Sequence, residues 1–71
     1  MSVQVGDKVK TKIEVYTIKI GMIGTVIRVP GSFANEPGYA NTIDVDFGND
    51  ENGALIGWNP FHLRDLQRRV K

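Results

Sequence analysis

The 71-residue chain contains no cysteine, and this absence excludes several kinds of chemistry at once. Disulfide bonds, thiolate nucleophiles, cysteine-ligated zinc and cysteine-held iron–sulfur clusters all require that residue. A chain without it is typical of a reducing compartment, and we expect a cytoplasmic protein. Because so short a chain buries little surface, any further stabilisation must come from packing or from a partner.

Long apolar runs are also missing. No stretch of about eighteen apolar residues exists, so no membrane-spanning helix is predicted. The first residues, Met1-Ser2-Val3-Gln4-Val5, lack the basic start and the apolar stretch of a signal peptide. The sequence therefore predicts a protein that is not exported and does not insert into a membrane.

Side chains that commonly perform catalysis or bind metals are scarce. His62 is the only histidine, so no histidine pair can hold a metal ion. The stretch from Asp44 resembles a calcium-binding loop, but Gly48 and Asn49 stand where that pattern requires a ligand and a glycine, which leaves weak cation binding as the alternative. Neither of the two serines lies in a nucleophile motif. We predict a chain that is not an enzyme and binds no cofactor, metal or small-molecule substrate.

Basic residues are missing from the middle of the chain. Residues 30–59 contain no Lys or Arg, whereas the segments on both sides are net positive and the whole chain carries +1. Such charge segregation suits oriented docking onto a charged protein, because a nucleic acid favours a continuous positive face. The alternative is that these are ordinary solvated surface charges. The acidic residues of the middle segment are Glu36, Asp44, Asp46, Asp50 and Glu51.

The chain does contain a series of short alternating segments. In residues 7–13 lysines alternate with Val, Thr and Ile, as in a strand with one wet face and one buried face. Residues 14–20 alternate less cleanly and end at a glycine. We interpret them as a long loop with Val15, Ile18 and Ile20 packed beneath it.

Three further segments have the composition of strands. Residues 24–29 are mainly β-branched, and the Pro-Gly pair after them ends the strand. Residues 42–47 alternate again, which places Asp44 and Asp46 on the outward face of a strand. A stretch dense in turn-forming residues then closes a hairpin onto residues 54–58.

The end of the chain completes the predicted fold. The Asn-Pro pair at 59–60 should end the preceding strand. One helical turn over residues 60–62 and a short strand over residues 63–67 follow. Five short strands with a helical turn before the last predict an all-β fold, a small five-stranded SH3-like barrel over residues 1–71 as a single domain, with a frayed tail at 68–71.

Aromatic residues gather in two regions. Trp58, Phe61 and His62 follow the acidic hairpin, while Phe33 and Tyr39 lie on the long loop 32–41, which a small barrel can bring near them. Exposed Trp and Tyr favour protein interfaces because they bury much area at little cost in rotamer entropy. Alternatively, Trp58 and Phe61 close one end of the core, and we expect one of the two in each role. The predicted partner-binding residues are Phe33, Tyr39, Trp58, Phe61 and His62, with Asp44, Asp46, Asp50 and Glu51 orienting a basic partner.

Several short, glycine-led motifs follow one another in a recognisable order. They are Val5-Gly6-Asp7-Lys8-Val9-Lys10, Glu14-Val15-Tyr16, the nine residues from Gly21 to Val29, Ala40-Asn41, Val45-Asp46-Phe47 and the segment from Pro60 to Leu66. This series resembles the variable (alpha) chain of ferredoxin:thioredoxin reductase over most of the sequence. Related barrels are the stromal peripheral subunit of photosystem I and the ferredoxin-docking subunit of the photosynthetic NDH complex.

The resemblance implies a five-stranded SH3-like barrel that carries no redox group. Such a chain stabilises a separate catalytic chain, and the iron–sulfur cluster and active disulfide belong to that partner. No catalytic residue is carried over, because the family has none on this chain. The sequence departs from the family pattern in a shorter loop between the first two strands and in Gly57-Trp58-Asn59, and these departures bear on the identity of the partner.

Two other interpretations come from resemblance. The segment from Gly21 to Val29 also resembles the KOW element that contacts RNA or a polymerase, and Lys8, Lys10 and Lys12 could supply positive charge, although the acidic middle segment opposes this. An enzyme similar to plasmid-type dihydrofolate reductase would need a Val-Gln-Ile-Tyr stretch, and residues 55–58 lack its Gln and Tyr.

Overall fold

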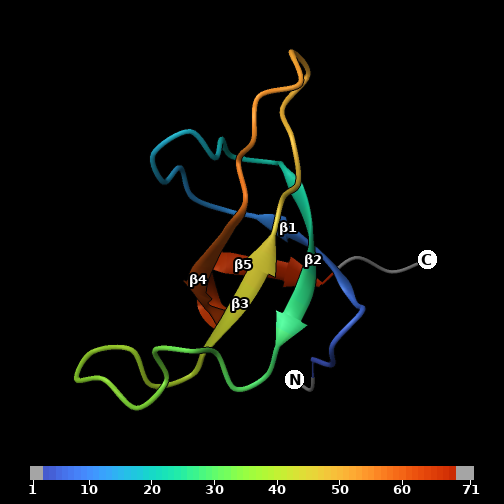
Figure 1. Ribbon diagram of the computed structural model, residues 1–71. Helices are drawn as coiled ribbons and strands as arrows, with labels where there is room; N and C mark the ends of the chain where they lie inside the picture. The colour runs from blue at the N-terminus through green and yellow to red at the C-terminus, as the bar shows by residue number, and fades with distance from the viewer. Residues whose placement is uncertain (1–2, 69–71) are drawn as a thin grey trace.

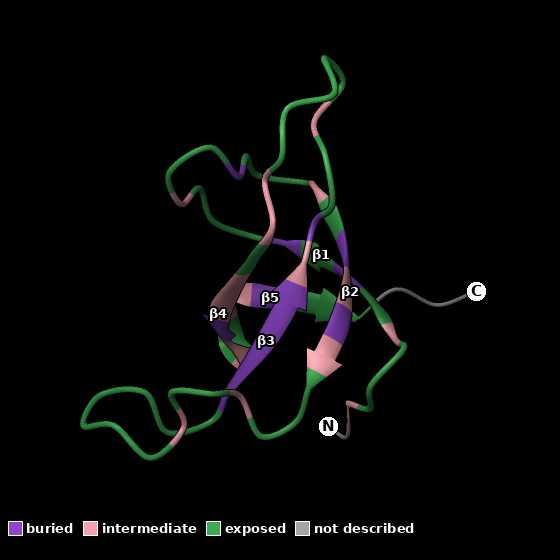
Figure 2. Ribbon diagram, viewed as in Figure 1, coloured by how far each residue is buried: buried purple, intermediate pink, exposed green. Residues whose placement is uncertain are grey.

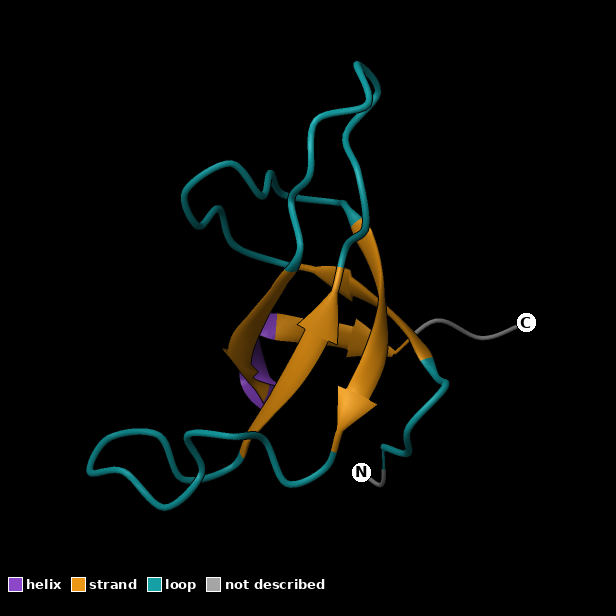
Figure 3. Cartoon of the chain, in the orientation of Figure 1, coloured by secondary structure: helices purple, strands orange, loops and turns teal. Residues whose placement is uncertain are grey.

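The computed structural model describes residues 3–68 and is mostly sheet (Figures 1 and 3). One 3₁₀ turn, η1 (Leu63–Asp65), precedes the last strand. No helix within the described part of the chain is long and apolar enough to cross a membrane. The five strands are β1 (Lys8–Thr11), β2 (Ile23–Arg28), β3 (Thr42–Asp46), β4 (Trp58–His62) and β5 (Leu66–Arg68).

The strands form one antiparallel sheet in the order β4-β3-β2-β1-β5. β1 and β5 run across the direction of β3 in Figure 1, so the sheet is strongly twisted. The hydrogen-bonded order is open, with β4 and β5 as its two edges. The predicted all-β fold, with five strands and a helical turn before the last, is confirmed at this level.

The predicted strand at residues 54–58 is wrong, because β4 spans Trp58–His62 instead. Residues 54–57 belong to the arm of a hairpin. Pro60 does not end the strand, because β4 is an edge. Phe47 N donates a hydrogen bond of 2.9 Å to the Gly57 carbonyl, and in an antiparallel pair every second residue is bonded to the neighbouring strand in this way. Pro60 lies at one of the residues in between, so its nitrogen faces the open edge, where no donor is needed.

The end of the chain is displaced from its predicted position for the same reason. The helical turn lies at Leu63–Asp65 rather than at residues 60–62, and the last strand at Leu66–Arg68 rather than at residues 63–67. Arg68, predicted as part of a frayed tail, is the last residue of β5. The rest of that tail, residues 69–71, lies outside the described residues.

The core is built from the inward-facing residues of the strands. Figure 2 shows buried positions concentrated on the strands, while most loop positions are exposed. Ile18 joins the core from the loop between β1 and β2, where two hydrogen bonds between Val15 and Ile18 form a tight turn. Ile20 is 67% exposed, so its predicted packing under that loop is wrong. The buried apolar residues are Val9, Ile18, Val26, Ile43, Val45, Phe47, Phe61 and Leu66.

Gly24 explains part of the glycine motif in β2. A Cβ atom at this position would lie 2.6 Å from Val45 Cγ1 and 2.8 Å from a ring carbon of Phe47. The absence of a side chain therefore lets β2 approach the core residues of β3 and the hairpin.

Candidate functional site

Four rings from two distant segments form a continuous row on the outer side of the sheet. Trp58 and His62 are the first and last residues of β4, and their alternate positions place them on one face. Phe33 and Tyr39 come from the loop at residues 30–41. Their ring centroids lie 6.2 Å apart for Trp58–Phe33, 5.9 Å for Phe33–Tyr39 and 6.2 Å for Tyr39–His62. We call Trp58, Phe33, Tyr39 and His62 the aromatic row.

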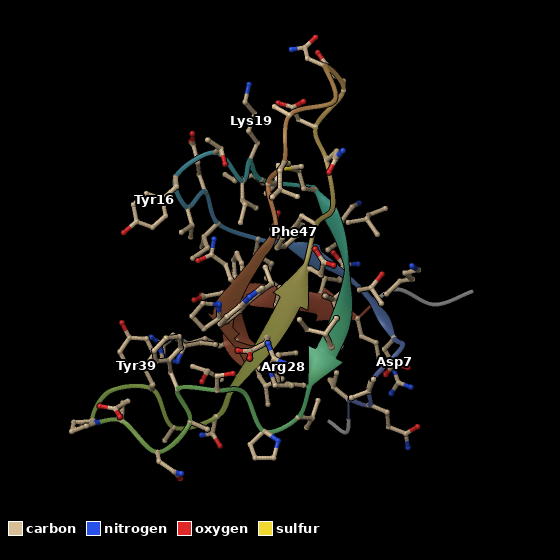
Figure 4. The ribbon with its side chains drawn as sticks, in the orientation of Figure 1. Asp7, Tyr16, Lys19, Arg28, Tyr39 and Phe47 are labelled. Carbon is tan, nitrogen blue, oxygen red and sulfur yellow. The ribbon has the colours of Figure 1, made fainter. Side chains whose placement is uncertain are left out.

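The aromatic row is open to solvent along its length. Phe33, Tyr39 and Trp58 are each between 41% and 43% exposed, and His62 is half-buried. The Arg28 guanidinium lies 5.1 Å from the centre of the Trp58 ring, within range of a cation–π contact. Figure 4 shows Arg28 and Tyr39 on the side of the molecule where the 30–41 loop lies. The row is thus a half-exposed apolar surface with a cation at its Trp58 end.

The 30–41 loop is held in place by a succession of turns. Gly31 N donates to the Thr42 carbonyl at 3.0 Å, which closes the loop at its base. Glu36 N donates to Phe33 O at 2.9 Å, and Tyr39 N donates to Glu36 O at 3.0 Å. These turns set the spacing of the two loop rings, so the loop presents Phe33 and Tyr39 in a defined arrangement.

A buried carboxylate connects this loop to the sheet. Asp44 of β3 is 0% exposed, and its Oδ2 accepts three hydrogen bonds. Arg28 Nε donates at 2.8 Å, Ser32 N at 3.0 Å and Ser32 Oγ at 2.7 Å. Asp44 therefore holds both the cation beside Trp58 and the loop residue that precedes Phe33.

Gly31 allows the loop to pass directly over this carboxylate. A Cβ on Gly31 would lie 2.8 Å from Asp44 Oδ1 and 3.1 Å from the backbone of Ile43. Oδ1 is buried and has no hydrogen-bond partner within residues 3–68. All of the hydrogen bonds that this carboxylate accepts within residues 3–68 thus go to Oδ2.

The surroundings of Asp44 act on its pKa in opposite directions. Burial raises the pKa of this carboxyl group, because removal from water disfavours the charged form. Hydrogen bonds from Ser32 and Arg28, together with the charge of Arg28, outweigh burial and hold the pKa below its ordinary value. Asp44 is therefore ionised at neutral pH.

We expect the stabilisation contributed by Asp44 to be lost only in acid. Because the folded pKa lies below the unfolded value of about 3.9, the contribution is complete above that value and disappears as the pH falls through the folded pKa. The difference in free energy of unfolding between the natural chain and Asp44→Asn should be constant near neutrality and shrink below about pH 4. Urea unfolding over a pH series measures it. A difference that varies mainly above about pH 5 would contradict this assignment.

The structure separates the predicted ring-bearing contact residues into two groups. It brings Phe33, Tyr39, Trp58 and His62 together, in agreement with the prediction that the long loop lies near the residues after the hairpin. Phe61 is 2% exposed and packs edge-on against Phe47 at 5.6 Å, so it belongs to the core and is not a surface contact. The expectation that Trp58 and Phe61 take different roles agrees with their burial.

The predicted acidic surface is also divided. The expectation that Asp44 faces solvent is wrong, because the 30–41 loop covers the outer face of β3 at this position. Asp46 is half-buried and accepts a hydrogen bond from Gly48 N at 2.9 Å. Asp50 and Glu51 lie at the tip of the hairpin, at the opposite end of the molecule from the 30–41 loop (Figure 1). The aromatic row therefore does not lie beside an all-acidic surface.

Arg28 and Ser32 belong to the candidate site and were missed by sequence reasoning. Arg28 lies opposite Asp44 in the β2–β3 register, and such a cross-strand pair of opposite charges was a usable signal. No comparable signal marked Ser32, because its role depends on the path of the loop.

Within residues 3–68, no group of three or more acidic or histidine side chains is placed to hold a metal ion. A shallow pocket of about 340 Å³ lies at the His62 end of the aromatic row and is lined by Ala40, Asn41, His62, Leu63 and Arg64.

Comparisons of the chain with protein-family models, curated proteins and solved structures found no significant match.

Proposed function

We propose that the chain is a non-catalytic docking module that binds a separate protein through the aromatic row. The observation that carries this proposal is the arrangement of three rings that are each about two-fifths exposed and held in fixed positions. Residues such as Trp and Tyr supply much of the binding energy at protein interfaces when a partner covers them.

The contacts beneath the row support this role. Asp44 holds Ser32 and Arg28, and these residues position Phe33 and contact Trp58. A partner would therefore not need to order the loop on binding. Ordering flexible segments costs affinity, so a surface already arranged in the free protein favours docking.

The family resemblance is carried into this proposal. The strand order and the 3₁₀ turn before β5 support an SH3-like barrel. On this proposal the chain has a cytoplasmic location, holds no cofactor, and stabilises a redox catalytic chain that carries the iron–sulfur cluster. The partner would then supply all of the redox chemistry.

The proposal predicts that Trp58→Ala weakens binding to such a catalytic chain while the fold is retained. The loss should be about 2 kcal/mol, or about thirtyfold in the dissociation constant. This size is expected because Trp58 is partly exposed and contacts both Arg28 and Phe33 of the same surface. Calorimetric titration of the catalytic chain of ferredoxin:thioredoxin reductase measures this loss.

The matched control for this experiment is Tyr16→Ala. Tyr16 is an aromatic residue that is 87% exposed and lies away from the row (Figure 4). This variant should bind the catalytic chain as the natural protein does. Equal losses for the two variants, or no binding by the natural protein, would reject the proposed function.

A polyanion-binding role of the KOW type is the second candidate, favoured by one observation. Lys8, Lys10 and Lys12 are all exposed, and alternate spacing places them on the same side of the chain in and after β1. A nucleic-acid titration at two salt concentrations separates the candidates. Tight binding that weakens steeply with salt, and is unchanged by Trp58→Ala, would favour this second role.

A further inference from the structure

Two loops form a cleft at the end of the molecule opposite the 30–41 loop. One loop joins β1 to β2, and the other is the hairpin between β3 and β4 (Figure 1). The cleft has a volume of about 560 Å³. Its lining residues are Thr17, Lys19 and Met22 from the first loop, and Asn49, Asp50, Glu51, Asn52 and Ile56 from the second.

The cleft has an apolar floor and a polar rim. Met22 and Ile56 are half-buried and pack against the core, so their exposed parts provide a rigid apolar base. The other lining residues carry hydroxyl, amide or charged groups. Pockets of this composition bind an apolar group at the base and orient it through polar contacts at the rim.

The same two loops carry the three most exposed large apolar residues of the described structure. Tyr16 is 87% exposed, Leu55 80% and Ile20 67%, and these are the most exposed large apolar residues in residues 3–68. Exposed apolar side chains on neighbouring loops indicate a candidate interaction surface.

The backbone of Tyr16 adds an independent observation. Its φ angle is +53°, a left-handed conformation that costs a bulky residue on the order of 1 kcal/mol. The tight turn between Val15 and Ile18 maintains this conformation through two hydrogen bonds of 2.9 and 2.8 Å. Because the Tyr16 side chain is almost fully exposed, packing within the protein does not offset the cost of this backbone conformation. The exposed ring therefore points to contact with another molecule.

The charges at the rim indicate the chemistry of the occupant. The rim carries two carboxylates, Asp50 and Glu51, and one ammonium group, Lys19. Asp50 Oδ1 is occupied by hydrogen bonds from Asn52 N and Ala54 N, whereas Glu51 makes no hydrogen bond or ion pair within the described residues. The rim therefore offers Glu51 and the second oxygen of Asp50 to a cationic group.

We propose that this cleft is a second docking surface, which binds a protein segment that combines an apolar side chain with a neighbouring Lys or Arg. The apolar side chain would cover Met22 and Ile56, and the cation would approach Glu51. An anionic lipid surface or a nucleic acid fits less well, because the rim carboxylates repel it. This inference goes beyond the proposed function, because it concerns another surface and another ligand.

Panning a displayed library of random linear peptides on the immobilised chain tests the proposal. Enriched peptides should carry an apolar residue next to Lys or Arg. For the best synthetic peptide, Glu51→Lys should weaken binding about tenfold and Lys19→Glu should strengthen it, because the first reverses an attractive charge and the second removes a repulsive one. Both positions are exposed, so neither substitution should disturb folding.

Trp58→Ala is the control that separates this proposal from the function assigned to the aromatic row. It should leave peptide binding unchanged, because Trp58 is not one of the residues that line the cleft. Selection of acidic peptides, loss of binding in Trp58→Ala, or failure to enrich any sequence would overturn the proposal. Binding to phosphatidylserine vesicles, or self-association abolished by Glu51→Lys, would overturn it in favour of a membrane or a second copy.

Discussion

Phe61→Ala is expected to unfold a large fraction of the protein. Phe61 is 2% exposed and packs against Phe47 at the centre of the core. Truncation of a buried phenylalanine costs about 3–5 kcal/mol, because the removed ring leaves a cavity that the surroundings fill only partly. A chain of 71 residues has a total stability of about 4–10 kcal/mol, so the loss is comparable with all of it.

Urea unfolding followed by circular dichroism measures this effect. Trp58→Ala is the matched control, since Trp58 lies three residues away in the same strand but is 41% exposed. It should shift the midpoint far less than Phe61→Ala. Phe61→Leu should remain folded with an intermediate loss, which gives a measurable value if the alanine variant is fully unfolded. Similar losses at Phe61 and Trp58 would show that the assigned division between core and surface is incorrect.

Asp44→Ala is expected to release the 30–41 loop and disorder the aromatic row. The substitution removes the acceptor of three hydrogen bonds, two of which come from Ser32 and one from Arg28. We expect a loss of about 2 kcal/mol. The loss should stay below that of a fully buried ion pair, because the Arg28 side chain is 48% exposed and regains water.

Hydrogen exchange resolves this effect from global unfolding. The amides of Gly31, Ser32 and Tyr39 should exchange faster in Asp44→Ala, whereas those of β1 should change only with the global stability. Asp46→Ala is the control, since this carboxylate lies two residues along β3 and accepts one hydrogen bond from Gly48 N. Unchanged exchange in the loop of Asp44→Ala would mean that the turns alone hold it.

Alternation predicted β1 and β3, and β-branched composition predicted β2, because each of these strands has one face in the core. Residues 7–13 and 42–47 contain β1 and β3, and residues 24–29 cover β2 except for its first residue, Ile23. β4 was misplaced because proline was assumed to end it. An edge strand tolerates proline where the missing N–H faces away from the sheet, and sequence alone does not reveal which strand is an edge.

The candidate site was predicted in its aromatic part but not in its charges. The meeting of Phe33 and Tyr39 with Trp58 and His62 was predicted because a small barrel can bring the long loop near the residues that follow the hairpin. Alternation correctly separates Asp44 from the core residues of β3, but it does not say whether solvent or a loop covers that outer face. Burial of Asp44 depends on Gly31, whose lack of a side chain permits the close passage of the loop.

Pro60 affects whether another copy of the protein can pair with the edge strand β4 at high concentration. An unpaired outer strand is a template on which another chain can add by backbone pairing, and continued addition produces fibrils. The nitrogen of Pro60 points outward at the middle of β4 and cannot donate a hydrogen bond. A strand that paired with β4 would therefore have one carbonyl group without a donor. Pro60 thus weakens the addition of a further strand at the β4 edge of the sheet.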